Sequence, residues 1–476
     1  MKKTLIAIFL SIILSSVSMQ ITATELINQK SENITIINVA LYPKHGGSDE
    51  LIQICLNYTW EENGNKYRFN VRELNSEELR GKGDYPLNKQ NFDVFIVGAN
   101  FNSYINDGRD ENFQKTVKKF LSDGGGFLGV CAGAFVASQG YEQPDNYYEK
   151  RVNEGVLKIA DIYLNDDFDG ELQYLLKELG EFTSSNVGQI SIEVEVNKTT
   201  SNPIFSEYNK ELFNIAYGGG AGMYPAEKND PKLGTINPLF TYNEELMETK
   251  PINYWKKALI GWKKSCKIQT DMKGQYGGIA TTYNNSGRIV LLSSHPEITV
   301  MENGTIEENF GKNILNLFRV VYIYKDGEKK NMSYNYWIHR RTVAWLAKVP
   351  DEDLPPVNEL MVFIDKPQFR LEYQLYLNDD IVLKRNNQTS RIVQKITSKL
   401  GKTIIIGPIT IEVYGENCHL VEFYIDDVLE HTRNSVPCNW TLDKKLNGIH
   451  KIEVRGYDEY GNYACDGSEY LFYNYS

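Results

Sequence analysis

The chain has 476 residues, which is more than one ordinary hydrophobic core contains, and predicts two or three domains. Its hydrophobic content of 41% and charged content of 24% are those of a globular protein and exclude a disordered chain. The net charge of −11, with no long basic run, argues against nucleic acid as a partner.

The N-terminus has the pattern of an export signal. Met1-Lys2-Lys3 is a short basic start, and residues 4–19 form an apolar run that small and polar residues follow. We interpret residues 1–24 as a signal peptide, with an uncleaved N-terminal anchor as the alternative. Either interpretation predicts a secreted or cell-surface protein that contacts a membrane only through an uncleaved N-terminus.

Strand-like and helix-like segments alternate after this leader. Residues 34–41 and 92–97 are apolar runs typical of buried parallel strands, residues 113–121 have helical spacing, and residues 127–130 form a third short strand. This alternation predicts a doubly wound α/β domain over residues 33–345, with a mostly parallel, flavodoxin-like sheet and helices on both faces. Residues 189–196 alternate like a half-exposed strand, and the turn at residues 284–287 indicates a hairpin.

The C-terminal part has a different character. Residues 346–357 are rich in proline and acidic residues and are interpreted as a linker. Short strand-like stretches separated by turns fill residues 358–476 and predict a β-sandwich. Three of the six cysteines, Cys418, Cys438 and Cys465, lie there, and the sequence leaves open whether any pair is bridged.

The first candidate for chemistry is Cys131, within Gly129-Val130-Cys131-Ala132-Gly133. A nucleophile at a sharp strand-to-helix turn needs small neighbours, and these glycines permit both the strained backbone and close packing. In that geometry the Ala132 N–H would face a developing oxyanion, and the helix N-terminus would favour the thiolate. A buried structural cysteine in a glycine-rich loop is the alternative.

The second candidate is Ser294-His295-Pro296-Glu297. Pro296 cannot donate to a sheet, so a strand should end here and leave His295 at its carboxyl end, where open sheets place their sites. A thiol nucleophile needs a base and the base needs an orienting acid, which are the expected roles of His295 and Glu297. His45, after the first strand, is the rival base, whereas His339 lies in a Tyr- and Arg-rich stretch beyond the expected sheet.

These motifs resemble the class I glutamine amidotransferase-like superfamily, and within it the domain named after the N-terminal region of some biotin-protein ligases. The resemblance covers residues 34–320 and implies an amidotransferase-type sheet with a Cys131-His295-Glu297 triad. The family's Pro-Gly-Gly oxyanion turn is replaced by Val97-Gly98-Ala99-Asn100, in which Gly98 is the expected second donor. Residues 218–220 match a family loop and either line the cleft or form a tight turn. The matching segments are INVALYPKHGGS, FDVFIVGAN, GGGFLGVCAGAFVAS, NIAYGGGAGM and GRIVLLSSHPEI.

The C-terminal part is similar to bacterial and archaeal Ig-like domains, through VEFYIDDVLEHT and CNWTLDKKLNGIHKIEVRGYDEYGN. Such a module implies spacing or attachment, with contact to a cell surface or polysaccharide.

Two functions remain open at this point. One is an exported thiol hydrolase of a small amide or peptide, and the other is a catalytically silent binding or adhesion protein on the same fold. The chain has no synthase domain to receive ammonia. No cluster with metal-ligand spacing occurs, so neither a metal nor a cofactor is expected.

Overall fold

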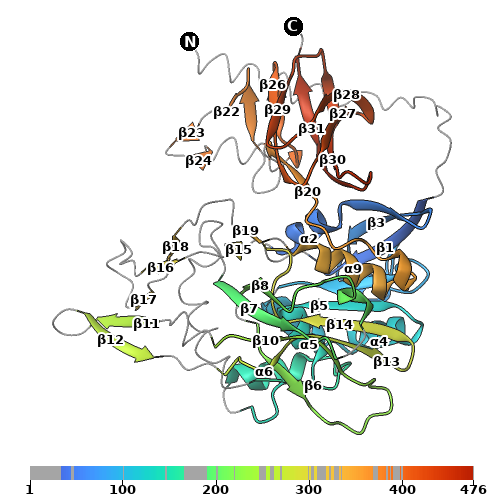
Figure 1. Cartoon of the computed structure of the whole chain (residues 1–476), viewed down its shortest axis with the longest axis vertical. Helices are drawn as coiled ribbons and strands as arrows, with labels where there is room; N and C mark the ends of the chain where they lie inside the picture. The colour runs from blue at the N-terminus through green and yellow to red at the C-terminus, as the bar shows by residue number, and fades with distance from the viewer. Residues whose placement is uncertain are drawn as a thin grey trace. The chain divides into compact units, whose positions relative to one another are not determined.

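Five parallel strands form the centre of the first part of the chain (Figure 1). In spatial order they are β3 (Asn65–Glu73), β1 (Ile34–Leu41), β4 (Val94–Val97), β5 (Gly126–Val130) and β14 (Gly287–Leu292). The sequences of β4, β5 and β14 are mostly apolar and buried, which suits strands covered on both faces, whereas β3 alternates between exposed and buried residues. Because β5 and β14 run parallel with Leu292 opposite Val130, the segments that follow them leave the same edge of the sheet.

Helices pack on both faces of these strands and enclose two hydrophobic cores. Helices α2 (Ser48–Leu56) and α9 (Tyr336–Leu346) share the first core, and α4 (Glu111–Ser122) and α5 (Ala132–Ala137) contribute to the second. The Asp110 side chain caps α4 by accepting from the Asn112 and Phe113 N–H groups. The remaining α-helices among the described residues are α3 (Phe101–Gly108) and α6 (Tyr147–Gly155).

Beyond β14 the sheet continues with antiparallel pairs. Strand β13 pairs with β14 across a short turn, β10 pairs with β13 and β7, and β7 pairs with β8, whereas β9 links β13 to β6. The bounds are β6 (Ile162–Leu164), β7 (Ile190–Val196), β8 (Leu212–Tyr217), β9 (Met223–Pro225), β10 (Asn237–Tyr242) and β13 (Tyr276–Tyr283). The hairpin and the strand expected at residues 189–196 are confirmed.

Strand β2 (Tyr58–Glu62) carries the sheet into the C-terminal part, because it pairs with β3 on one side and with β31 (Tyr463–Tyr473) on the other. There β31 pairs with β30 and β25, β30 with β27, and β27 with β28, whereas β20, β26 and β29 form a separate sheet. The bounds are β20 (Met361–Lys366), β21 (Leu375–Leu377), β22 (Asp380–Ile381), β25 (Ile404–Ile406), β26 (Ile409–Glu416), β27 (Leu420–Ile425), β28 (Val428–Arg433), β29 (Cys438–Leu442) and β30 (Asn447–Tyr457).

Short elements complete the described structure. The strands are β11 (Asn253–Lys257), β12 (Trp262–Lys267), β15 (Val300–Met301), β16 (Thr305–Glu307), β17 (Phe318–Val320), β18 (Ile323–Lys325), β19 (Met332–Ser333), β23 (Lys384–Arg385) and β24 (Gln388–Thr389), and the 3₁₀ turns are η1 (Glu78–Arg80), η2 (Pro203–Phe205) and η4 (Asp351–Asp353).

The prediction of a doubly wound, flavodoxin-like α/β fold is wrong. Within the described ranges the structure is largely β, and its main sheet is mixed and has 19 strands. The alternation that suggested α/β holds only near the start of the chain. After α6 (Tyr147–Gly155) the neighbouring strands are mostly antiparallel, and an antiparallel pair needs only a tight turn where a parallel pair needs a crossover helix.

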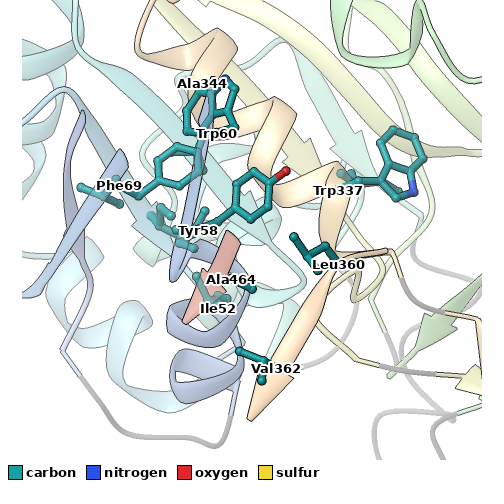
Figure 2. Close-up of a cluster of buried hydrophobic side chains, with 14 of the residues drawn as sticks. Ile52, Tyr58, Trp60, Phe69, Trp337, Ala344, Leu360, Val362 and Ala464 are labelled. Atoms are coloured by element: carbon teal, nitrogen blue, oxygen red, sulfur yellow. The ribbon is translucent and has the colours of Figure 1, made fainter. Parts of the chain in front are cut away.

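One buried cluster joins segments from both ends of the chain (Figure 2). Trp60 on β2 stacks on Tyr67 with ring centroids 5.1 Å apart, and its indole N–H donates to the Asp353 carbonyl over 2.9 Å. Leu360 and Ala464 from the C-terminal part belong to the same cluster. The expected domain boundaries at residues 345 and 358 stay a prediction, and residues 34–476 form one compact unit.

The computed structural model describes residues 34–43, 48–99, 101–144, 147–165, 190–199, 202–218, 220–245, 253–257, 262–267, 271–298, 300–301, 305–307, 318–320, 323–325, 332–333, 335–367, 374–381, 384–385, 388–389, 397 and 400–474. The expected leader at residues 1–24 and the rival base His45 lie outside them. No helix in these ranges has the length and apolar character needed to span a bilayer. Cys418, Cys438 and Cys465 are free thiols.

Candidate active site

Cys131 occupies a strained turn between β5 and α5. Its backbone has φ 51° and ψ −106°, a conformation that residues other than glycine rarely adopt. The Cys131 N–H donates to the Leu292 carbonyl over 2.7 Å, which ties the turn to the end of β14. Strain of this kind gathers at functional sites, and the strand-turn-helix context is the one that the sequence predicted.

The two glycines beside Cys131 are required by close packing. A Cβ atom on Gly129 would lie 2.5 Å from the Gly133 carbonyl oxygen. A Cβ atom on Gly133 would lie 1.9 Å from the Val97 carbonyl oxygen, at the end of β4. Only glycine lets α5 approach both strands this closely.

His295 and Glu297 follow β14 and form a buried pair. The His295 Nδ1 atom lies 2.8 Å from Glu297 Oε1, and the exposed fractions of the two residues are 3% and 0%. The backbone N–H of His295 donates to the Ala216 carbonyl over 2.8 Å, so β8 fixes the backbone of this segment. With Nδ1 committed to Glu297, the other ring nitrogen is left for the Cys131 thiol, which is within hydrogen-bonding reach of His295.

The electrostatics of the site favour charged forms in spite of its burial. Burial opposes protonation of His295, but the charges of Cys131 and Glu297 and their hydrogen bonds outweigh it and raise the His295 pKa well above its usual value. Burial likewise opposes ionisation of Glu297, but the charge and hydrogen bond of His295, together with His339, lower the Glu297 pKa to about 2. A protonated His295 beside an ionised Glu297 is the state these interactions stabilise.

His339 was not expected to belong to the site, because it lies in a Tyr- and Arg-rich stretch beyond the expected sheet. This residue lies on α9, is fully buried, and places Nε2 3.2 Å from Glu297 Oε2. The signal that was available is the spacing of Ile338, Thr342 and Trp345, which is that of one face of a helix. Helix α9 packs against β5 and β14, the two strands that precede Cys131 and His295.

The expected oxyanion donors lie next to the thiol turn. Ala132 is the first residue of α5, where a backbone N–H has no partner within its own helix. Gly98 is buried and follows Val97, whose carbonyl oxygen lies against α5 at Gly133. A Cβ atom added to Gly220 would lie 1.7 Å from the Ser293 carbonyl oxygen. Gly220 is therefore a position of tight packing beside the segment that carries His295. Asn100 and Gly219 lie outside the described residues.

Cys131 is enclosed, and one cavity among the described residues lies away from it. Cys131 is only 5% exposed. A cavity of about 660 Å³ opens near the turn between β13 and β14, at the other end of β14 from His295. Within the described ranges no three His, Cys, Asp or Glu side chains gather as a metal site would require. The cavity is lined by Asn202, Pro203, Leu233, Gly234, Thr235, Asn237, Ala280, Thr281, Thr282, Asn285 and Trp345.

No family model and no curated protein matches the chain. The crystal structure of SMU.1228c is similar with 12% identity and a TM-score of 0.26, over 56% of this chain and 78% of that one. The Trypanosoma brucei CTPS glutaminase domain with bound acivicin gives 12% identity and a TM-score of 0.26, over 55% of this chain and 86% of that one. The structures of the Clostridium thermocellum CbhA fibronectin(III)-like modules give 14% identity and a TM-score of 0.16, over 24% of this chain and 98% of that one. Neighbours this weak do not identify a family, so the expected family stays a prediction.

Proposed function

We propose that the protein is a thiol hydrolase of an amide or peptide-type bond, with Cys131 as nucleophile, His295 as proton carrier and Glu297 as the acid that orients it. The observation that carries the proposal is the strained backbone of Cys131 beside a histidine that is hydrogen-bonded to a buried carboxylate. A structural cysteine needs neither the strain nor the pair.

The reaction follows from these positions. The Cys131 thiolate attacks the carbonyl carbon, and the Ala132 and Gly98 N–H groups stabilise the oxyanion. As the C–N bond breaks, protonated His295 gives its proton to the leaving nitrogen, and a thioester remains. His295 then takes a proton from water, the hydroxide attacks the thioester, and the acid and the Cys131 thiolate are released. Glu297 keeps the ring oriented throughout.

The proposal is tested by the pH dependence of Cys131 alkylation by iodoacetamide, read by mass spectrometry of the Cys131 peptide. We expect alkylation to begin at higher pH in His295→Ala than in the wild type, because the variant lacks the imidazolium that would stabilise a thiolate at Cys131. His419→Ala, an exposed histidine far along the chain, is the matched control and should leave the profile unchanged.

The other thiols provide an internal reference. Burial raises the pKa of Cys465 to about 12, and it also raises the pKa of the half-buried Cys438. An activated Cys131 should therefore react faster than both at neutral pH, although it is no more exposed than Cys438. Equal or slower labelling of Cys131 would contradict the nucleophile role.

The enclosure of Cys131 favours a second candidate, a binding protein that keeps the turn without the chemistry. In that case small and bulky electrophiles should both fail to label Cys131. Labelling by iodoacetamide, with hydrolysis of a γ-glutamyl or simple amide substrate that Cys131→Ser abolishes, supports the hydrolase instead.

We further propose that the protein is exported, on the basis of the basic start and apolar run at residues 1–19. N-terminal sequencing of protein from the medium and from the cell surface tests this, since a start after residue 24 indicates cleavage and an intact Met1 at the cell surface indicates an anchor. Contact with a cell surface or polysaccharide through residues 358–476 stays a prediction.

A further inference from the structure

We propose that His339 is a positioning residue of this site, which holds the second carboxylate oxygen of Glu297 so that the first stays aimed at His295. This inference rests on the proposed function. It adds a fourth residue to the chain of contacts that begins at Cys131.

The geometry gives Glu297 one histidine on each oxygen. Oε1 lies 2.8 Å from His295 Nδ1 and Oε2 lies 3.2 Å from His339 Nε2. The two histidines come from different elements, because His295 follows β14 whereas His339 lies within α9. When both oxygens of a carboxylate are hydrogen-bonded to groups on separate elements, the carboxylate cannot rotate about its terminal C–C bond without losing one of the two hydrogen bonds.

The His339 ring is committed to this contact. An ionised carboxylate only accepts hydrogen bonds, so Nε2 carries the proton and donates it to Oε2. The other ring nitrogen, Nδ1, is buried and has no hydrogen-bond partner among the described residues. Burying that nitrogen unpaired has a free-energy cost, and a core leucine would not incur it. The hydrogen bond to Glu297 is the interaction that accounts for a histidine at this position.

The residues next to this hydrogen bond hold α9 in place. Arg340, the next residue on α9, is fully buried and donates from Nε to the Cys55 carbonyl over 2.9 Å, which fixes α9 against α2. The Cys55 thiol is fully buried, and burial above all raises its pKa well above the usual value, so that it stays neutral. The side chains that hydrogen-bond to the Glu297 carboxylate are His295 and His339, and both act to lower its pKa.

His339 should act through Glu297 on the thiol. Its hydrogen bond is among the interactions that lower the Glu297 pKa to about 2, and the Glu297 charge in turn favours the protonated form of His295. If the second oxygen is released, Glu297 holds His295 less firmly and the thiolate–imidazolium pair is weakened. A role in packing alone would leave that pair intact.

The test is the pH profile of Cys131 alkylation in His339→Leu, which removes the donor with a small change in volume. We expect alkylation to begin at higher pH than in the wild type and to be about tenfold slower at pH 7, the scale of one lost hydrogen bond to a charged group. His339→Gln keeps an N–H donor and should restore most of the wild-type profile. Thr342→Val, one turn further along α9, is the control for general disturbance of the helix.

The outcomes separate the two proposals. A folded His339→Leu with the wild-type profile overturns the positioning role and leaves the proposed function standing. A wild-type Cys131 that is no more reactive than Cys438 overturns the proposed function itself. If His339→Leu does not fold, His339→Asn replaces it, because its shorter amide should not reach Glu297. Equal profiles for the Asn and Gln variants would then overturn the positioning role.

Discussion

Gly133→Ala is expected to disable the thiol turn although it improves the helix. In α5, alanine would normally stabilise the protein by about 0.8–1 kcal/mol relative to glycine. Here the added Cβ would lie 1.9 Å from the Val97 carbonyl oxygen, so α5 and β4 must separate by at least about 1 Å. The displaced residue on β4 precedes Gly98, one of the two expected oxyanion donors.

The expected magnitudes follow from that displacement. Overpacking of this kind costs about 1–3 kcal/mol of unfolding free energy, which exceeds the gain in helix propensity. A shift of about 1 Å in a reacting group can reduce its rate about 100-fold. We therefore expect a lower midpoint in urea denaturation and a Cys131 alkylation rate at pH 7 that falls by about one to two orders of magnitude.

Gly274→Ala is the matched control, because its added Cβ would meet nothing within 4 Å. Its positive φ of 88° makes it costly for stability, but it should leave Cys131 alkylation unchanged. If Gly133→Ala is as stable and as reactive as the wild type, the packing argument for the glycine pair is wrong.

Two further predictions concern stability. Burial raises the Glu359 pKa to about 8, whereas in the unfolded chain the carboxyl releases its proton near pH 4.5. The contribution of this proton to the unfolding free energy is therefore fully present below pH 4.5 and is lost as the pH rises through 8. Glu359→Gln should therefore lose less unfolding free energy than the wild type between pH 5 and pH 8.5, by up to about 4 kcal/mol, and parallel urea curves for the two proteins would refute this. Trp60→Ala should lower the unfolding free energy by about 3–5 kcal/mol, because it leaves a cavity in the buried cluster that joins the two ends of the chain. Tyr460→Ala, at a residue that is 81% exposed, should change it by less than about 0.5 kcal/mol in the same assay.

The local pattern around Cys131 could be predicted from the sequence because short-range sterics determine it. A cysteine flanked by glycines after an apolar run leaves few conformations open, and the strained turn at Cys131 is one of them. The proline after His295 likewise marks the end of β14. These features depend on neighbours in the chain, so no knowledge of the tertiary structure was needed.

The global fold and His339 could not be predicted in the same way. The choice between parallel and antiparallel neighbours for β7 and β13 depends on distant partners, and the apolar pattern of each strand alone does not select them. The stretch around His339 contains Arg340 and Arg341, which suggest a solvent-exposed segment. Both guanidinium groups are in fact buried and donate to backbone carbonyls, a form of compensation that only the folded chain reveals.

The pairing of β2 with β31 has a consequence for dividing this protein. A fragment that ended before residue 346 would keep β2 with one edge unpaired, and an open strand edge invites association with other chains. The same cut would remove the carbonyl of Asp353 that receives the Trp60 indole N–H. Val349 and Leu354, in the interval between the two halves, also belong to the shared hydrophobic core, so either half placed alone in another protein would expose apolar surface that has to be redesigned.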